Sequence, residues 1–132
     1  MDINIFVSMG FKNKSTEEIL RYLKFTEQFY RHNTEYITDE DNINVFCNYY
    51  DDEHKPEYVD DKKSNKKLND LSRALSIMAN CDVFVLYTNP NGSVPFGCNI
   101  EMMAWINSGN VINNRTPIIL NSGLLNVHEK EK

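Results

Sequence analysis

Four short apolar runs divide the chain, and the segments between them carry apolar residues at helical spacing. The runs are rich in β-branched and aromatic residues, which predicts strands at 3–8 (INIFVS), 42–50 (NINVFCNYY), 82–87 (DVFVLY) and 116–120 (TPIIL). In the intervening segments apolar residues recur every three or four positions. This spacing predicts helices at about 16–32, 64–79 and 97–108.

Strict alternation of strands and helices predicts an α/β fold. We expect one domain spanning 1–132, with an open parallel sheet of about four to five strands and helices on both faces, of the flavodoxin or Rossmann-like type. Ser15 and Glu18 have the spacing of a capping box at the start of the first helix. The polar, proline-containing segment 51–64 predicts a mobile loop, and 121–132 predicts a polar tail.

Composition and charge exclude several classes of partner. The net charge of −5 argues against duplex nucleic acid, because phosphate neutralisation requires clustered Lys and Arg. The chain has no apolar stretch near the ~20 residues of a membrane span, and MDINIFVSMG lacks a signal peptide's cationic region, so we expect a cytoplasmic protein without a membrane partner. Three cysteines without metal-ligand spacing predict no metal, and no motif predicts a cofactor.

Ligands of open α/β sheets bind beyond the carboxyl ends of the strands, which selects three loops here. After the first strand, backbone amides could hold an anion with help from Ser8, Met9, Gly10 and Lys12. After the second strand, Tyr49 could stack on a flat ring. After the third strand, the loop 88–97 exceeds the ~2–6 residues of most such connections. It contributes Asn89, Asn91, Ser93, Phe96 and Gly97 as lining residues, with Phe96 as a second stacking surface.

Two carboxylates flank this predicted edge, and each has a plain structural explanation beside a catalytic one. Glu101 follows the loop 88–97 at the start of an apolar helix, where the helix dipole alone favours an acid. Asp70 borders the apolar stripe of the preceding helix and could simply face solvent. From the residues alone, both explanations stay open.

Three segments resemble the nucleoside 2-deoxyribosyltransferase-like superfamily, in particular its short phage- and bacteria-encoded members of unassigned role. They are IFVSMGFKNKSTEEI, NDLSRALSIMANCDVFVLY and NPNGSVPFGCNIEMMAWINSG. Together they cover under half of the chain, and GCNIE, which resembles the approach to that family's nucleophile, is the most specific part.

The resemblance implies that Glu101 attacks the anomeric carbon of a nucleoside or nucleotide and that Asp70 helps the base to leave. It also implies a homo-oligomer, with the tail around 121–126 as a candidate for completing a neighbour's site. The chain departs from the family at Pro95, where transferases commonly carry an aspartate that binds the sugar or the base. We therefore expect an N-glycosidase rather than a base-exchanging transferase. A non-catalytic nucleotide-binding module and an NAD-consuming glycohydrolase remain the alternatives.

Overall fold

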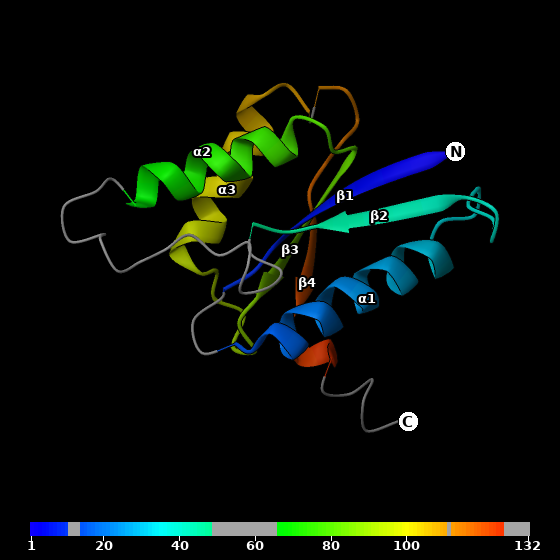
Figure 1. The fold of residues 1–132 in the computed structure, drawn as a ribbon, viewed down its shortest axis with the longest axis horizontal. Helices are drawn as coiled ribbons and strands as arrows, with labels where there is room; N and C mark the ends of the chain where they lie inside the picture. Colours follow the sequence, from blue (N-terminus) through cyan, green and yellow to red (C-terminus); the bar gives the residue numbers. More distant parts are fainter. Residues whose placement is uncertain (11–13, 49–65, 111, 126–132) are drawn as a thin grey trace.

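Four parallel strands form one open sheet in the order β2-β1-β3-β4 (Figure 1). The strands are β1 (Asp2–Ser8), β2 (Asn42–Phe46), β3 (Val83–Thr88) and β4 (Ile118–Asn121). This computed structural model describes residues 1–10, 14–48, 66–110 and 112–125. The predicted α/β fold with an open, all-parallel sheet is confirmed.

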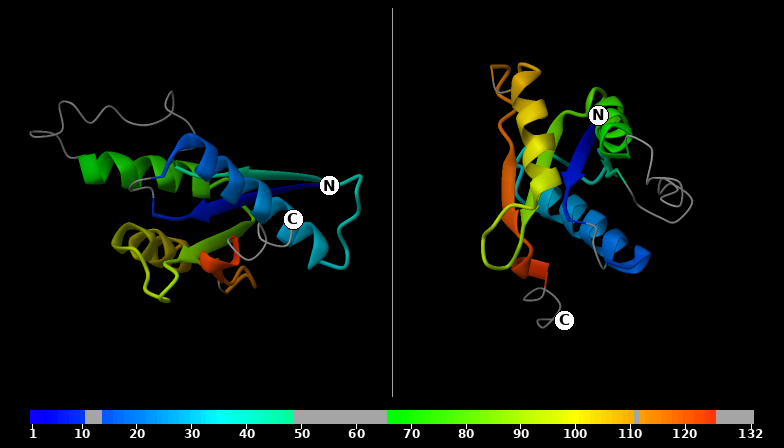
Figure 2. Two further views of the ribbon diagram at one scale, coloured as in Figure 1. Left: turned by 90° about the horizontal axis from the view of Figure 1, so that it is seen from below. Right: turned by 90° about the vertical axis from the view of Figure 1, so that its left-hand side faces the viewer.

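Among the described residues, three helices cover the two faces of the sheet. They are α1 (Thr16–His32), α2 (Lys66–Met78) and α3 (Phe96–Asn107). Helix α1 packs on one face, whereas α2 and α3 lie side by side on the other (Figure 2). At the start of α1, the Ser15 hydroxyl accepts a hydrogen bond from the Glu18 amide at 3.2 Å. The Glu18 carboxylate accepts from the Ser15 hydroxyl at 3.4 Å rather than from the Ser15 amide, so only the forward half of the predicted capping box forms.

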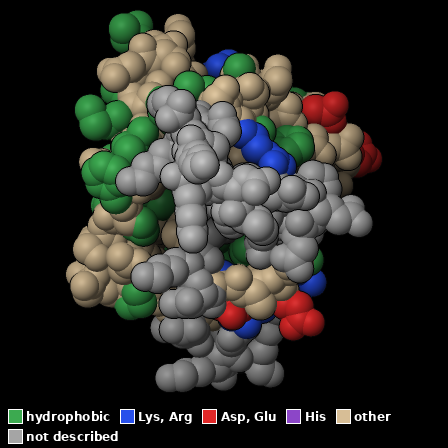
Figure 3. All heavy atoms as spheres, turned by 60° about the vertical axis from the view of Figure 1, so that its left-hand side comes forward, with side chains coloured by type: hydrophobic (Ala, Val, Ile, Leu, Met, Phe, Trp, Pro, Cys, Tyr) green, Lys and Arg blue, Asp and Glu red, His purple; other side chains and the backbone are tan. Residues whose placement is uncertain are grey.

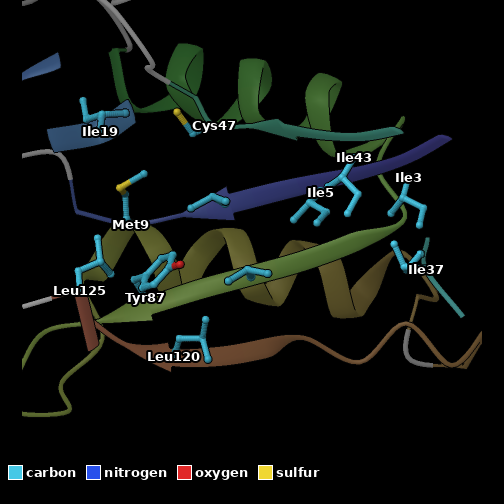
Figure 4. Close-up of a cluster of buried hydrophobic side chains, with 12 residues drawn as sticks. Ile3, Ile5, Met9, Ile19, Ile37, Ile43, Cys47, Tyr87, Leu120 and Leu125 are labelled. Atoms are coloured by element: carbon cyan, nitrogen blue, oxygen red, sulfur yellow. The ribbon is translucent and has the colours of Figure 1, made fainter. Parts of the chain in front are cut away.

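The central strands divide their side chains between two cores. Residues of one parity in β1 and β3 point toward α1 and join a cluster that includes Ile5 and Tyr87 (Figure 4). Residues of the other parity point toward α2 and α3, where Phe84 stacks on Phe6 and contacts Trp105 at 5.5 Å between ring centroids. Both faces of these strands are therefore buried, as their continuous apolar sequences predict. By the same alternation, Ser8 at the end of β1 faces the α3 side of the sheet.

Most boundaries lie within one or two residues of the sequence-based expectation, and two differences are more informative. The strand expected at 42–50 ends at Phe46, which is also where pairing with β1 ends. The segment expected as a polar tail begins inside the fold, because Asn121 closes β4 and Leu125 is buried in the α1-side core. The predicted mobile loop at 51–64 and the rest of the tail, 126–132, lie outside the described residues.

Helix length also bears on membrane association. Within the described ranges, no helix combines the length and the apolarity that crossing a bilayer requires.

Candidate functional site

The carboxyl ends of β1 and β3 form the point where the strand order of the sheet reverses. From β1 the chain passes through α1 to β2 on one side, and it returns through α2 to β3 on the other side. The loops that leave β1 and β3 therefore turn toward opposite faces, and a crevice opens between them in folds of this kind. Ser8 and Leu86 are paired at this edge, with Thr88 closing β3.

Glu101 reaches this edge from α3 and bonds to the end of β1. Its carboxylate oxygen Oε1 accepts a hydrogen bond from the Ser8 hydroxyl at 2.6 Å, across 93 residues of sequence. This length is typical of a hydroxyl bound to an ionised carboxylate. Ser8 is only 1% exposed, whereas Glu101 is partly exposed. The contact thus fixes one carboxylate oxygen at the sheet and leaves part of the side chain open to solvent.

The helix dipole does not explain Glu101. Helix α3 begins at Phe96, so Glu101 is its sixth residue, and the first turn contains no acidic residue. The dipole's influence on a side chain falls off within the first turn. The bond to Ser8 ties this carboxylate to the sheet, in a helix that carries no other charged residue.

Cys98 and Lys14 complete the surroundings of this pair. Cys98 precedes Glu101 by one helical turn and is buried. Burial raises the pKa of its thiol to about 11, the Ser8 hydroxyl opposes that rise, and the Glu101 carboxylate adds to it. Cys98 is therefore an uncharged packing residue at neutral pH and a poor nucleophile. Lys14 donates to the Gly10 carbonyl, and its ammonium lies 5.4 Å from the centroid of the Tyr22 ring.

The loop after β3 is held in shape by its own polar side chains. The Asn89 amide donates to the Ser93 hydroxyl at 2.9 Å, and that hydroxyl donates to the Asn91 side-chain oxygen at 2.7 Å. Asn121 of β4 donates to the Pro90 carbonyl at 3.2 Å and ties the loop to the sheet. Asn89, Asn91 and Ser93 were predicted to line a ligand site, and here they form hydrogen bonds with one another.

The loops after β1 and β3 approach one another at Gly10 and Pro95. A Cβ atom on Gly10 would stand 3.5 Å from the Pro95 ring, which is ordinary van der Waals contact. Pro95, which the sequence marks as a departure from the transferase pattern, therefore closes the space beside the loop after β1.

The other predicted site residues fall into two groups. Met9 points into the α1-side core, as Figure 4 shows, so only its backbone faces the predicted edge. Phe96 and Gly97 are exposed at the first two positions of α3, with Phe96 74% exposed. Lys12 and Tyr49 lie outside the described residues.

The structure describes the backbone position of Asp70 but not its side chain. Asp70 is the fifth residue of α2. Helices α2 and α3 both begin at the carboxyl edge of the sheet and pack against each other on the same face. Positions 70 and 101 therefore lie within the first two turns of neighbouring helices, and the predicted pairing of these two carboxylates stays a prediction.

Sequence reasoning treated Ser8 as a substrate ligand and missed it as the partner of Glu101. A signal was present: the alternation of β1 directs Phe6 and Ser8 to the face that α3 covers.

Among the described residues, no three His, Cys, Asp or Glu side chains gather as metal ligands would. Neither a protein-family model nor a curated protein sequence matches the chain.

Proposed function

We propose that the protein cleaves the N-glycosidic bond of a nucleoside or nucleotide, with Glu101 as the nucleophile. The observation that carries the proposal is the 2.6 Å bond from Ser8 to Glu101 at the carboxyl edge, where the strand order reverses. That edge is where open α/β sheets bind ligands. A partly exposed carboxylate, oriented by a buried hydroxyl, has the positioning that covalent catalysis needs. The resemblance of GCNIE to the deoxyribosyltransferase-like nucleophile segment adds independent support.

The reaction proceeds in two displacements at one carbon. A Glu101 oxygen attacks the anomeric carbon, the carbon–nitrogen bond to the base breaks, and the base leaves with the bonding electron pair. We assign Asp70 as the acid that protonates the departing base, on the strength of the resemblance and its place on α2. Water then attacks the same carbon, gives a proton to the Asp70 carboxylate, and releases the sugar and Glu101.

Three features suit a nucleotide-like substrate in this position. Exposed Phe96 offers a flat apolar surface for a base, at the start of the helix that carries Glu101. Lys14 lies beside the loop after β1 and supplies a positive charge for a substrate phosphate. Loop 89–95 is braced by its internal hydrogen bonds and forms the wall opposite that loop.

The second candidate is a module that binds a nucleotide without cleaving it. Two observations favour it: Pro95 stands where transferases commonly carry an aspartate, and the polar side chains of the neighbouring loop bond to one another. An NAD-consuming glycohydrolase would use the same glutamate on a different leaving group.

The deciding experiment measures free-base release by chromatography. The substrates are ribo- and deoxyribonucleosides, their monophosphates and NAD. Wild type is compared with Glu101→Gln, which keeps the size of the side chain but removes its charge. Glu40→Gln is the matched control, because Glu40 is exposed in the connection before β2, at the opposite edge of the sheet.

We expect release that is lost in Glu101→Gln and kept in Glu40→Gln. Nicotinamide release from NAD alone would select the glycohydrolase. If no substrate releases a base but a nucleotide raises the melting temperature, the binding module is correct and the proposed chemistry is wrong. Equal release by wild type and Glu101→Gln would remove Glu101 from the mechanism.

A further inference from the structure

The loop after β3 carries the only Asn-Gly sequence of the chain, at Asn91 and Gly92. Both residues are exposed. Among the described residues, no atom beyond the chain neighbours of Gly92 lies within 4 Å of the point where a Cβ would stand. A glycine nitrogen has no β-carbon to shield it from the preceding side chain. Because the Asn91 carboxamide and this nitrogen belong to one short segment, they are placed for an intramolecular reaction.

Hydrogen bonds of the folded loop hold both reacting groups. The Gly92 amide donates to the Asn89 carbonyl at 2.8 Å, which disfavours loss of its proton. The Asn91 oxygen Oδ1 accepts from the Ser93 amide at 3.0 Å and from the Ser93 hydroxyl at 2.7 Å, so the carboxamide is fixed beyond Gly92. The Asn89 amide donates to the Ser93 carbonyl at 2.8 Å and closes the loop.

We propose that Asn91 is a site of spontaneous deamidation and that the folded loop slows this reaction by holding both groups. The Gly92 nitrogen loses its proton to a base in the solvent and attacks Cγ of Asn91. The bond from Cγ to the side-chain nitrogen breaks, and that nitrogen takes up a proton and leaves as ammonia. Water then opens the cyclic imide to aspartate or isoaspartate. Overall, water is consumed and ammonia released, with nothing oxidised or reduced.

The two products fit the folded loop differently. The hydrogen bonds from Ser93 go to Oδ1 of Asn91, an atom that aspartate retains. Isoaspartate lengthens the main chain before Gly92 and disrupts its turn to Asn89. Figure 3 shows hydrophobic and uncharged polar atoms along the side of the molecule where α3 and this loop lie, so either product adds a negative charge to an uncharged surface. The inference does not depend on the proposed chemistry.

The test follows deamidation at each asparagine by peptide mass spectrometry, in a mildly alkaline buffer with and without guanidinium chloride. In the unfolded chain we expect Asn91 to react fastest. In the native protein we expect its rate to be about tenfold lower or less, because the loop must first open against its hydrogen bonds. Asn121 is the internal control: its Oδ1 accepts from the Gly123 amide at 2.8 Å in a similar turn, but a serine follows it.

Ser93→Ala tests the restraint itself. It removes the hydroxyl bond to Asn91 and should raise the native rate by about threefold or more, with no change in the unfolded chain. Ser72→Ala, exposed on α2, is the matched control and should change neither rate. The fluorescence of buried Trp105 verifies that both variants are folded under native conditions.

Three outcomes would overturn the proposal. If Asn91 reacts no faster than Asn121 in the unfolded chain, Asn91 is not a deamidation site. If its native and unfolded rates agree, the folded loop does not hold the reaction back. If folded Ser93→Ala reacts at the wild-type rate or more slowly, the hydrogen bonds from Ser93 do not restrain Asn91.

Discussion

The Ser8–Glu101 bond gives a stability prediction that holds whatever the protein does. Ser8→Ala removes a 2.6 Å hydrogen bond to a carboxylate and leaves that carboxylate partly buried beside Cys98. Hydrogen bonds to charged groups contribute about 1.5–3 kcal/mol net. Because Glu101 is partly exposed, water can replace some of the lost bond. We therefore expect Ser8→Ala to lower the free energy of unfolding by about 1.5–2 kcal/mol.

A double-mutant cycle isolates this one contact. Ser8→Ala, Glu101→Ala and the double variant are unfolded with urea and followed by the fluorescence of Trp105, the chain's single tryptophan, which is 1% exposed and should report unfolding sensitively. The coupling energy of the two sites should be about 1–2 kcal/mol. Ser72→Ala is the control: Ser72 is exposed on α2, and its loss should change stability by under about 0.5 kcal/mol.

Additive effects of the Ser8 and Glu101 substitutions on the free energy of unfolding would contradict the expected contact. If the loss in the double variant equals the sum of the losses in the two single variants to within about 0.5 kcal/mol, the two side chains do not interact in solution. The orientation of Glu101 would then need another cause, and the main support of the proposed function would be gone.

Two further predictions concern the loops and the thiols. Gly92→Ala should lower the free energy of unfolding by about 1–2 kcal/mol, because Gly92 has a φ of +88°. Gly10→Ala should leave the free energy of unfolding nearly unchanged, because its new methyl group would lie 3.5 Å from the Pro95 ring. The midpoints of urea unfolding distinguish the two variants. Burial raises the pKa of Cys98 from 9.0 to about 11, so the folded state holds a proton that the unfolded state releases in this window. Stability should therefore fall as pH rises from 9 to 11, by up to about 1.4 kcal/mol per pH unit for this thiol, and Cys98→Ala should flatten that part of a urea-midpoint profile.

Most of the fold could be predicted because each helix and strand has a recognisable pattern of residues in its own segment. The β-branched runs and the three-to-four spacing of apolar residues place all four strands and all three helices among the described residues. The second strand was predicted too long because its apolar character continues through Cys47, which is buried but lies beyond the end of β2. Pairing between β1 and β2 ends at Phe6 and Phe46, although β1 itself continues to Ser8, so the end of β2 is a property of the sheet rather than of the segment's own sequence.

The site was less predictable because its central contact joins residues 93 positions apart. The carboxyl edge could be named from the alternation of elements, and the sequence correctly placed Glu101 on the helix entering that edge. Two details required coordinates. Glu101 reaches back to the sheet from the second turn of α3, and Ser8 points inward to meet it. Met9 next to it turns to the opposite core, so neighbouring residues that look equivalent in sequence serve different faces of the sheet.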